Sequence, residues 1–149
     1  MNPVIFIRVS LIFLMAIIPL CFIGYLLAVD YENLFFLFEW SIIFFLIAAT
    51  AMAFAGAFQA REKRSRWVLI SILAFCLHIA VLCIFLGPLS IYPMFWVYYV
   101  VIFIAFFVYF HTIIKVKANR TVPVLLMISS SLITLFIVFQ HMLWGANLT

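Results

Sequence analysis

The chain has 149 residues, of which 71% are hydrophobic and only 8% are charged. A soluble domain is typically about 45–50% apolar and about 25% charged, and so few charges could not cover the surface of a soluble protein of this size. The composition therefore excludes a soluble enzyme, a nucleic-acid-binding domain and a disordered tail. The formal net charge is +4, but in so apolar a chain the positions of the basic residues are more informative than their sum.

Apolar blocks separated by short polar segments follow one another along the chain. A helix needs about 20 apolar residues to cross a hydrocarbon core of about 30 Å. The first block ends at DYEN, and the charged segment QAREKRSR separates the second block from the third. The blocks predict five spans, over residues 8–29, 34–58, 67–87, 93–114 and 121–144.

The split between the third and fourth spans depends on proline. Residues 67–114 contain no Asp, Glu, Lys or Arg, and as one helix they would extend for roughly 70 Å, about twice what a bilayer needs. Gly87–Pro93 contains two prolines, which disfavour helix. The predicted fold is an all-α integral membrane protein, a bundle of five transmembrane helices forming a single domain over residues 1–149, with no soluble domain.

The basic residues predict the direction of insertion. In a five-span arrangement every Lys and Arg falls on one side, which the positive-inside rule assigns to the cytoplasm. We therefore expect a cytoplasmic N-terminus and an outside C-terminus, and the compactness of the chain favours a bacterial inner membrane. The residues concerned are Arg8, Arg61, Lys63, Arg64, Arg66, Lys115, Lys117 and Arg120.

The sequence shows no motif for catalysis, for a metal or for a cofactor. The three cysteines lie within spans and form no CxxC pair. His78, His111 and His141 fall at central, inner and outer depths, so no two of them match as ligands of a bis-histidine haem. We predict that the protein is not an enzyme and uses no cofactor or metal.

Glu39 is an ionisable residue within the second span, where charge is costly. It either reaches headgroups and water or faces protein. Small residues mark close helix contacts in membranes, and this span carries the row Ala49-x-x-x-Ala53-x-x-x-Ala57 together with Gly56. We predict that Ala49, Ala53, Gly56 and Ala57 form a helix-packing surface, and that Glu39 points toward protein.

His141 shares one face of the fifth span with Ser130 and Thr134. If the second and fifth spans are neighbours, His141 can pair with Glu39 near the outer surface, where such a pair could titrate or hold a cation. The other interpretation is a histidine that simply reaches water at the interface.

His78 lies near the middle of the third span. We expect either a neutral histidine hydrogen-bonded to another helix or a proton- or ligand-binding role. Tyrosines and tryptophans gather toward the outer end, where some of them could line an outward-opening cavity near Glu39 and His141. They are Tyr25, Tyr31, Trp40, Tyr92, Trp96, Tyr98, Tyr99 and Trp144.

Two hypotheses on function follow. The first is a small inner-membrane protein that acts through helix–helix association, with another membrane protein or with itself, as an accessory, assembly or immunity-type subunit. The alternative is a small transporter or ligand-binding membrane protein. Its site would comprise Glu39, His141, Trp40 and Trp96, with His78 as a proton relay. Both hypotheses place the chain in a lipid bilayer and neither involves nucleic acid.

Overall fold

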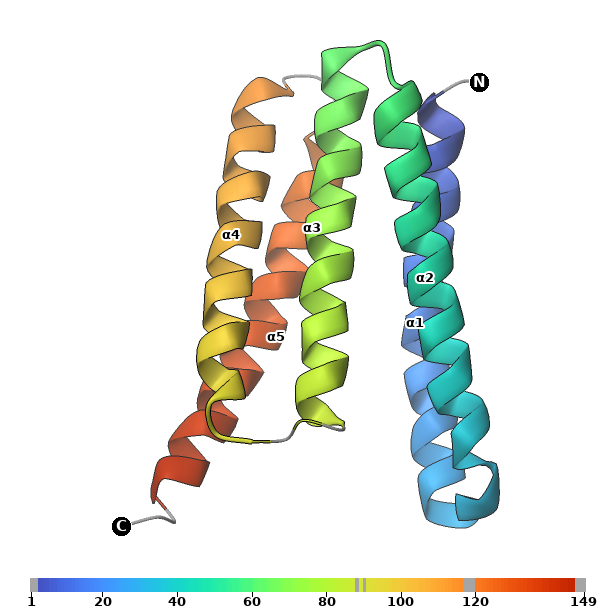
Figure 1. Cartoon of the computed structure of the whole chain (residues 1–149), viewed down its shortest axis with the longest axis vertical. Helices are drawn as coiled ribbons and strands as arrows, with labels where there is room; N and C mark the ends of the chain where they lie inside the picture. Colours follow the sequence, from blue (N-terminus) through green and yellow to red (C-terminus); the bar gives the residue numbers. More distant parts are fainter. Residues whose placement is uncertain (1–2, 88, 90, 117–119, 147–149) are drawn as a thin grey trace. The chain divides into compact units, whose positions relative to one another are not determined.

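The computed structural model describes residues 3–87, 89, 91–116 and 120–146, the last three through their backbone alone. These residues are all-helical and include no strand, and they form five helices long and apolar enough to span a membrane. The elements, shown in Figure 1, are α1 (Pro3–Asp30), the short 3₁₀ helix η1 (Glu32–Leu34), α2 (Phe35–Gln59), α3 (Lys63–Leu86), α4 (Met94–Lys115) and α5 (Thr121–Ala146).

The helices cover the predicted apolar stretches, and α1 and α3 extend beyond them at their N-terminal ends. The extension of α3 includes basic residues, which are good helix formers. Its first turn is held by local bonds: the Ser65 hydroxyl donates to the Glu62 carboxylate over 3.0 Å, and Arg66 donates to the Ala60 carbonyl over 3.1 Å. A helix therefore continues into the polar segment although the apolar stretch has ended.

The predicted break in the long uncharged run is confirmed. α3 ends at Leu86, and α4 begins directly after Pro93. The Gly87 amide donates to the Cys83 carbonyl over 3.0 Å, which completes the last turn of α3. Pro88 lies outside the described residues, as does Lys117 between α4 and α5.

The chain forms two compact units, Met1–Leu73 and Ala74–Thr149. The first contains α1, η1, α2 and the beginning of α3. The second contains the remainder of α3 with α4 and α5. Each unit is described separately below.

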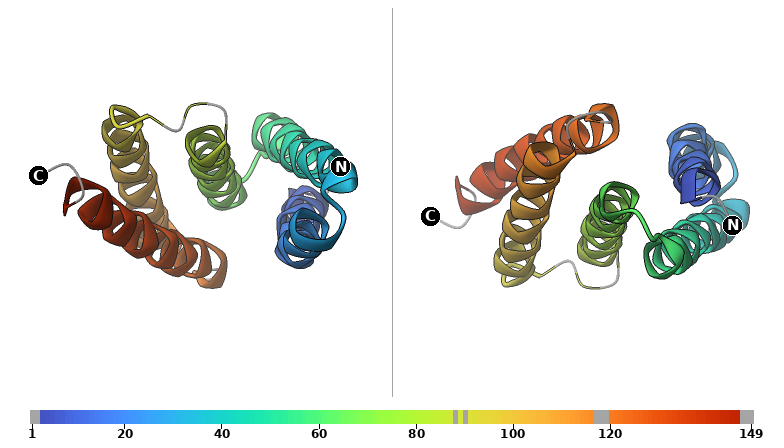
Figure 2. Two further views of the ribbon diagram at one scale, coloured as in Figure 1. Left: turned by 90° about the horizontal axis from the view of Figure 1, so that it is seen from below. Right: turned by 90° about the horizontal axis from the view of Figure 1, so that it is seen from above.

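In the first unit, α1 and α2 lie side by side and run antiparallel (Figures 1 and 2). The buried residues of α2 are Ala49, Ala53 and Gly56, all small. A Cβ atom added to Gly56 would lie 2.6 Å from the Cβ atom of Phe6 on α1. Gly56 of the predicted small-residue surface thus contacts α1 within the chain, and Ala57 is half-buried.

In the second unit, α4 packs on α5, and one face of α4 is buried. The end of α3 joins this core through Phe85, whose ring centroid lies 4.7 Å from that of Phe95 on α4. The buried positions of α4 recur every three or four residues, as expected for one face of a helix. They are Phe95, Tyr98, Ile102, Ala105, Tyr109 and Thr112.

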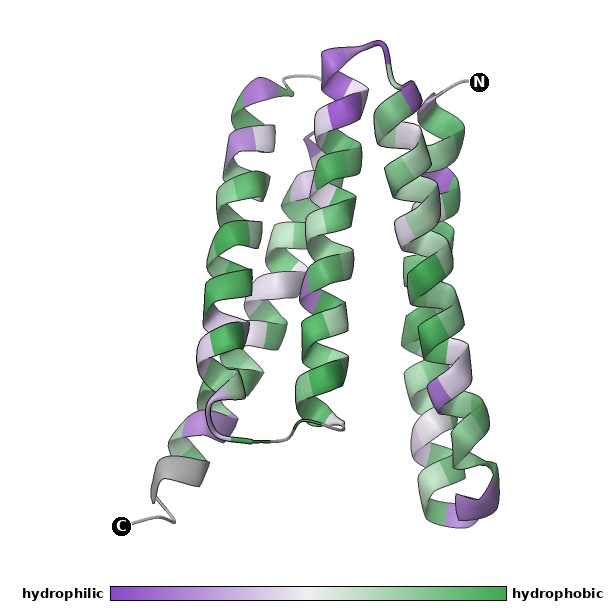
Figure 3. Ribbon diagram, in the orientation of Figure 1, coloured by the Kyte–Doolittle hydropathy of each residue, from purple (hydrophilic) through white to green (hydrophobic). Residues whose placement is uncertain are grey.

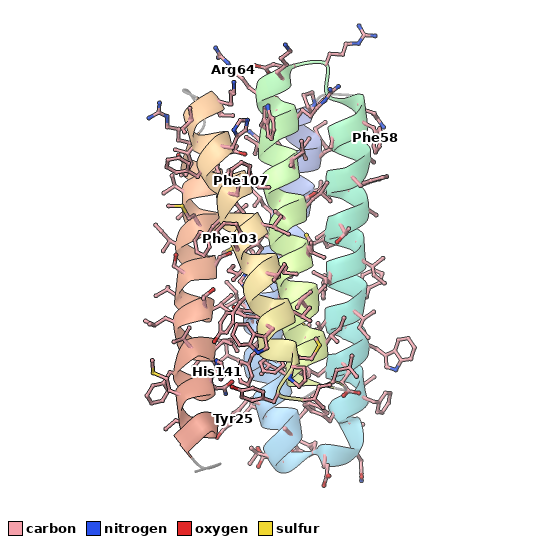
Figure 4. All side chains as sticks on the ribbon, turned by 60° about the vertical axis from the view of Figure 1, so that its left-hand side comes forward. Tyr25, Phe58, Arg64, Phe103, Phe107 and His141 are labelled. Atoms are coloured by element: carbon pink, nitrogen blue, oxygen red, sulfur yellow. The ribbon has the colours of Figure 1, made fainter. Side chains whose placement is uncertain are left out.

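Outside these cores the helices expose large apolar side chains. Phe22 of α1, Phe58 of α2 and Phe103 of α4 are 72%, 72% and 74% exposed, and the last two are labelled in Figure 4. Figure 3 shows apolar residues along the length of each helix, with hydrophilic residues gathered at the α2–α3 turn. Contiguous apolar surface of this extent is unusual for a soluble protein and is compatible with a multi-pass membrane protein.

Candidate functional site

His78 is the centre of a polar cluster inside the second unit. Its side chain is fully buried, at 0% exposure. The Nε2 atom lies 2.8 Å from the hydroxyl of Tyr98 on α4, and the Nδ1 atom lies 3.1 Å from the hydroxyl of Ser130 on α5. Both ring nitrogens are therefore hydrogen-bonded, each to a different helix, as expected for a histidine that bonds across helices.

Further hydroxyl groups extend the cluster in both directions. The Tyr109 hydroxyl lies 3.2 Å from the Ser130 hydroxyl. The Tyr98 hydroxyl lies 3.3 Å from that of Thr134, which donates to the Ser130 carbonyl over 2.7 Å. We call the series Tyr109, Ser130, His78, Tyr98 and Thr134 the His78 chain.

The bond to the Ser130 carbonyl fixes the direction of half of this chain. A hydroxyl has one proton, and Thr134 uses its own on that carbonyl. A hydrogen bond between the Tyr98 and Thr134 hydroxyls, whose oxygens lie 3.3 Å apart, then has Tyr98 as its donor. Since the Tyr98 proton is then committed, the oxygen of Tyr98 accepts from an Nε2–H group of His78.

The same reasoning fixes the other half. A neutral imidazole with a proton on Nε2 has an acceptor at Nδ1, so Ser130 donates to His78. Tyr109 then donates to the Ser130 oxygen. Every hydroxyl proton of the His78 chain is used, and all the bonds run in one direction, from Tyr109 to the backbone of α5.

No carboxylate balances this cluster within its own unit. The four acidic residues of the chain are Asp30, Glu32, Glu39 and Glu62, and residues 63–149 contain none. The His78 chain therefore consists of neutral donors and acceptors, which avoids the cost of an unpaired buried charge.

His141 lies in a second cluster, toward the end of α5, where it is labelled in Figure 4. Its Nδ1 atom lies 2.8 Å from the Tyr99 hydroxyl, and its Nε2 atom lies 3.1 Å from the Tyr92 hydroxyl. The ring stacks on Phe95, with centroids 4.1 Å apart and an interplanar angle of 13°. This cluster is partly exposed, and both ring nitrogens of His141 have tyrosine partners.

The other residues selected from the sequence are on the surface of their units. Trp40 is 69% exposed and Trp96 is 64% exposed. Glu39 is exposed on α2, and no hydrogen bond or ion pair joins it to another residue in the described part of the chain. Because Glu39 belongs to the first unit and His141 to the second, their pairing stays a prediction, as does the protein-facing position of Glu39.

The tyrosines of the His78 chain were not singled out by the sequence. Tyr98 belongs to the aromatic residues toward the outer end, and Tyr109 lies toward the other end of the same predicted span. One signal could have found the pair: residues 11 apart share a helical face at roughly 100° per residue, and on that face both tyrosines can reach a polar residue in mid-span.

Comparisons with known proteins do not assign the protein to a family. No protein-family model matches the chain, and no curated protein or solved structure matches it. Among the described residues, no three His, Cys, Asp or Glu side chains are grouped as ligands for a metal. In its described residues the structure is all-helical, with five helices of membrane-spanning length.

Proposed function

We propose that all five helices cross a lipid bilayer, with the N-terminus in the cytoplasm and the C-terminus outside. The exposed apolar surface of each helix supports insertion, because lipid tails can cover it without cost. The basic residues at the α2–α3 turn and at the end of α4 support the orientation. We place the chain in a bacterial inner membrane.

Within that membrane we propose a non-enzymatic subunit that acts through helix–helix association, in an accessory, assembly or immunity-type role. The observation that carries this proposal is the exposed carboxylate of Glu39 on α2. A charge at the centre of a span costs about 2.5–3.5 kcal/mol on insertion scales, and less toward its ends. A partner helix that offers a hydrogen-bond donor to Glu39 would remove this cost.

The contact surface differs from the one that the sequence favoured. Because Ala49, Ala53 and Gly56 are already buried within the chain, we propose a different surface for a partner. The partner surface that we propose lies around Glu39, where Trp40 and Ile43 of α2 are 69% and 48% exposed. Tryptophan is enriched at protein interfaces and among the residues that contribute most to binding.

The test is purification of a tagged chain from membranes in a mild detergent. We expect a stoichiometric partner or a homo-oligomer with the natural chain, and its loss with Glu39→Gln, which keeps the shape of the side chain but removes its charge. Glu32→Gln is the matched control, because Glu32 lies in η1 outside the long helices. A strictly monomeric natural chain, or an unchanged complex with Glu39→Gln, would contradict the proposal.

The alternative is a small transporter or ligand-binding protein with an outward-facing pocket around Glu39 and His141. The observation that favours it is the partly exposed cluster of His141 with Tyr92 and Tyr99. On this alternative, Glu39→Gln and His141→Ala would each abolish a ligand-dependent phenotype at normal expression. If neither variant has an effect, the pocket is excluded.

A further inference from the structure

The His78 chain joins α3, α4 and α5 through consecutive contacts between polar atoms. The hydroxyls of Tyr109 and Tyr98 are connected through Ser130 and His78 by separations of 3.2, 3.1 and 2.8 Å, and the Tyr98 hydroxyl lies 3.3 Å from that of Thr134. All of these groups can donate or accept a hydrogen bond, so they form one continuous row inside the second unit.

We propose that the His78 chain is a proton relay, with His78 as the group that accepts a proton on one side and releases one on the other. A proton from water reaches the Tyr109 oxygen, the Tyr109 proton passes to Ser130, and the Ser130 proton passes to Nδ1 of His78. The Nε2 proton passes to Tyr98, the Tyr98 proton passes to Thr134, and the Thr134 proton leaves to water. One proton enters and one leaves, and no electron is transferred.

The direction of the bonds is what allows this transfer. Each group from Tyr109 to Tyr98 already donates to the group that must receive its proton, so only the Thr134 hydroxyl has to turn for the first transfer. Histidine can use both nitrogens in turn, which serine or tyrosine cannot. After one transfer the imidazole carries its proton on Nδ1, and the groups must reorient before the next transfer.

The structure describes this relay closed at both ends, and on the entry side Tyr109 is fully buried, so water must gain access to it first. The last proton, on Thr134, is directed to the Ser130 carbonyl, which is not a site that takes up a proton. The rings of Tyr98 and Tyr99 have centroids 5.9 Å apart, and no hydrogen bond joins their hydroxyls in the described part of the chain. Release therefore requires the Thr134 hydroxyl to turn toward a water molecule, or toward the Tyr99–His141 cluster.

The test is proton flux into liposomes that contain the purified full-length chain and a pH-sensitive dye. A potassium gradient with valinomycin supplies the driving force. We expect the natural protein to acidify the liposomes faster than the protein-free background. With His78→Phe the rate should fall to that background. With Thr134→Val, which removes one hydroxyl at nearly constant volume, the rate should be markedly reduced. His111→Phe is the matched control, since His111 is a histidine of the same unit outside the His78 chain, and it should conduct like the natural chain.

The outcomes are decisive in either direction. The proposal is overturned if the natural protein acidifies liposomes no faster than the protein-free background. It is also overturned if His78→Phe or Thr134→Val acidifies them as fast as the natural protein. Size-exclusion elution and helical circular dichroism establish that each variant is folded. If His78→Phe does not fold, Thr134→Val alone decides. Because only this chain is present in the liposomes, the result is independent of whether it has a partner protein.

Discussion

The Nε2 atom of His78 on α3 lies 2.8 Å from the hydroxyl of Tyr98 on α4, in the buried core of the second unit. This bond connects two helices that are joined in sequence only by the segment around Gly87. If the Tyr98 proton is committed to Thr134, the proton of the imidazole is on Nε2.

Tyr98→Phe should destabilise the protein, because it removes the acceptor of the His78 Nε2–H group and the donor to Thr134. We expect a loss of about 1 kcal/mol in the free energy of unfolding, in the range measured for hydrogen bonds between helices in membranes. Unfolding by SDS in mixed micelles measures it. Tyr25→Phe is the control, since Tyr25 is 69% exposed; equal effects of the two variants would be evidence against the Tyr98 bonds.

Gly56→Val should loosen the pairing of α1 with α2. Even the first added carbon would lie 2.6 Å from the Phe6 Cβ atom and 3.1 Å from the Leu69 Cδ1 atom, so the helices must separate. Overpacking of this kind typically costs about 1–3 kcal/mol. A thermal melt in detergent measures the effect against Ala51→Val, an exposed position on the same helix. The interpretation of the packing is wrong if both variants melt alike.

The topology predicts opposite labelling of two sites. In a chain with Cys21, Cys76 and Cys83 replaced by alanine, Asn33→Cys should react with a membrane-impermeant maleimide on intact cells. Ser65→Cys should react only after the cells are permeabilised, because it lies beside the basic residues of the α2–α3 turn. Both sites are exposed or partly exposed. The reverse pattern would invert the proposed orientation, and labelling of both sites on intact cells would contradict a membrane span between them.

The helices could be predicted from the sequence because their signals are local. Apolar length, the charged segment before Trp67 and the prolines around Gly87 each act on their own stretch of chain. The shared face of Ser130 and Thr134 was also predictable from helical periodicity, and both residues lie in the His78 chain.

The partners of each face could not be predicted in the same way, because they depend on which helices are neighbours. The small residues of α2 suggested a contact, but only the structure shows that Phe6 of α1 and Leu69 of α3 lie against Gly56. Tyr98 has the residue type of an interfacial anchor, and its position beside His78 becomes visible only when α3 and α4 are placed together.

The most direct test of the directed His78 chain is the protonation pattern of the His78 ring. Solid-state NMR of the protein in lipid, with ¹⁵N-labelled histidine and His78→Gln for assignment, distinguishes the two nitrogens. We predict a neutral ring with the proton on Nε2 and none on Nδ1. A proton on Nδ1 and none on Nε2 would mean that Tyr98 donates to His78. That result would contradict the proposed direction of the hydrogen bonds in the His78 chain.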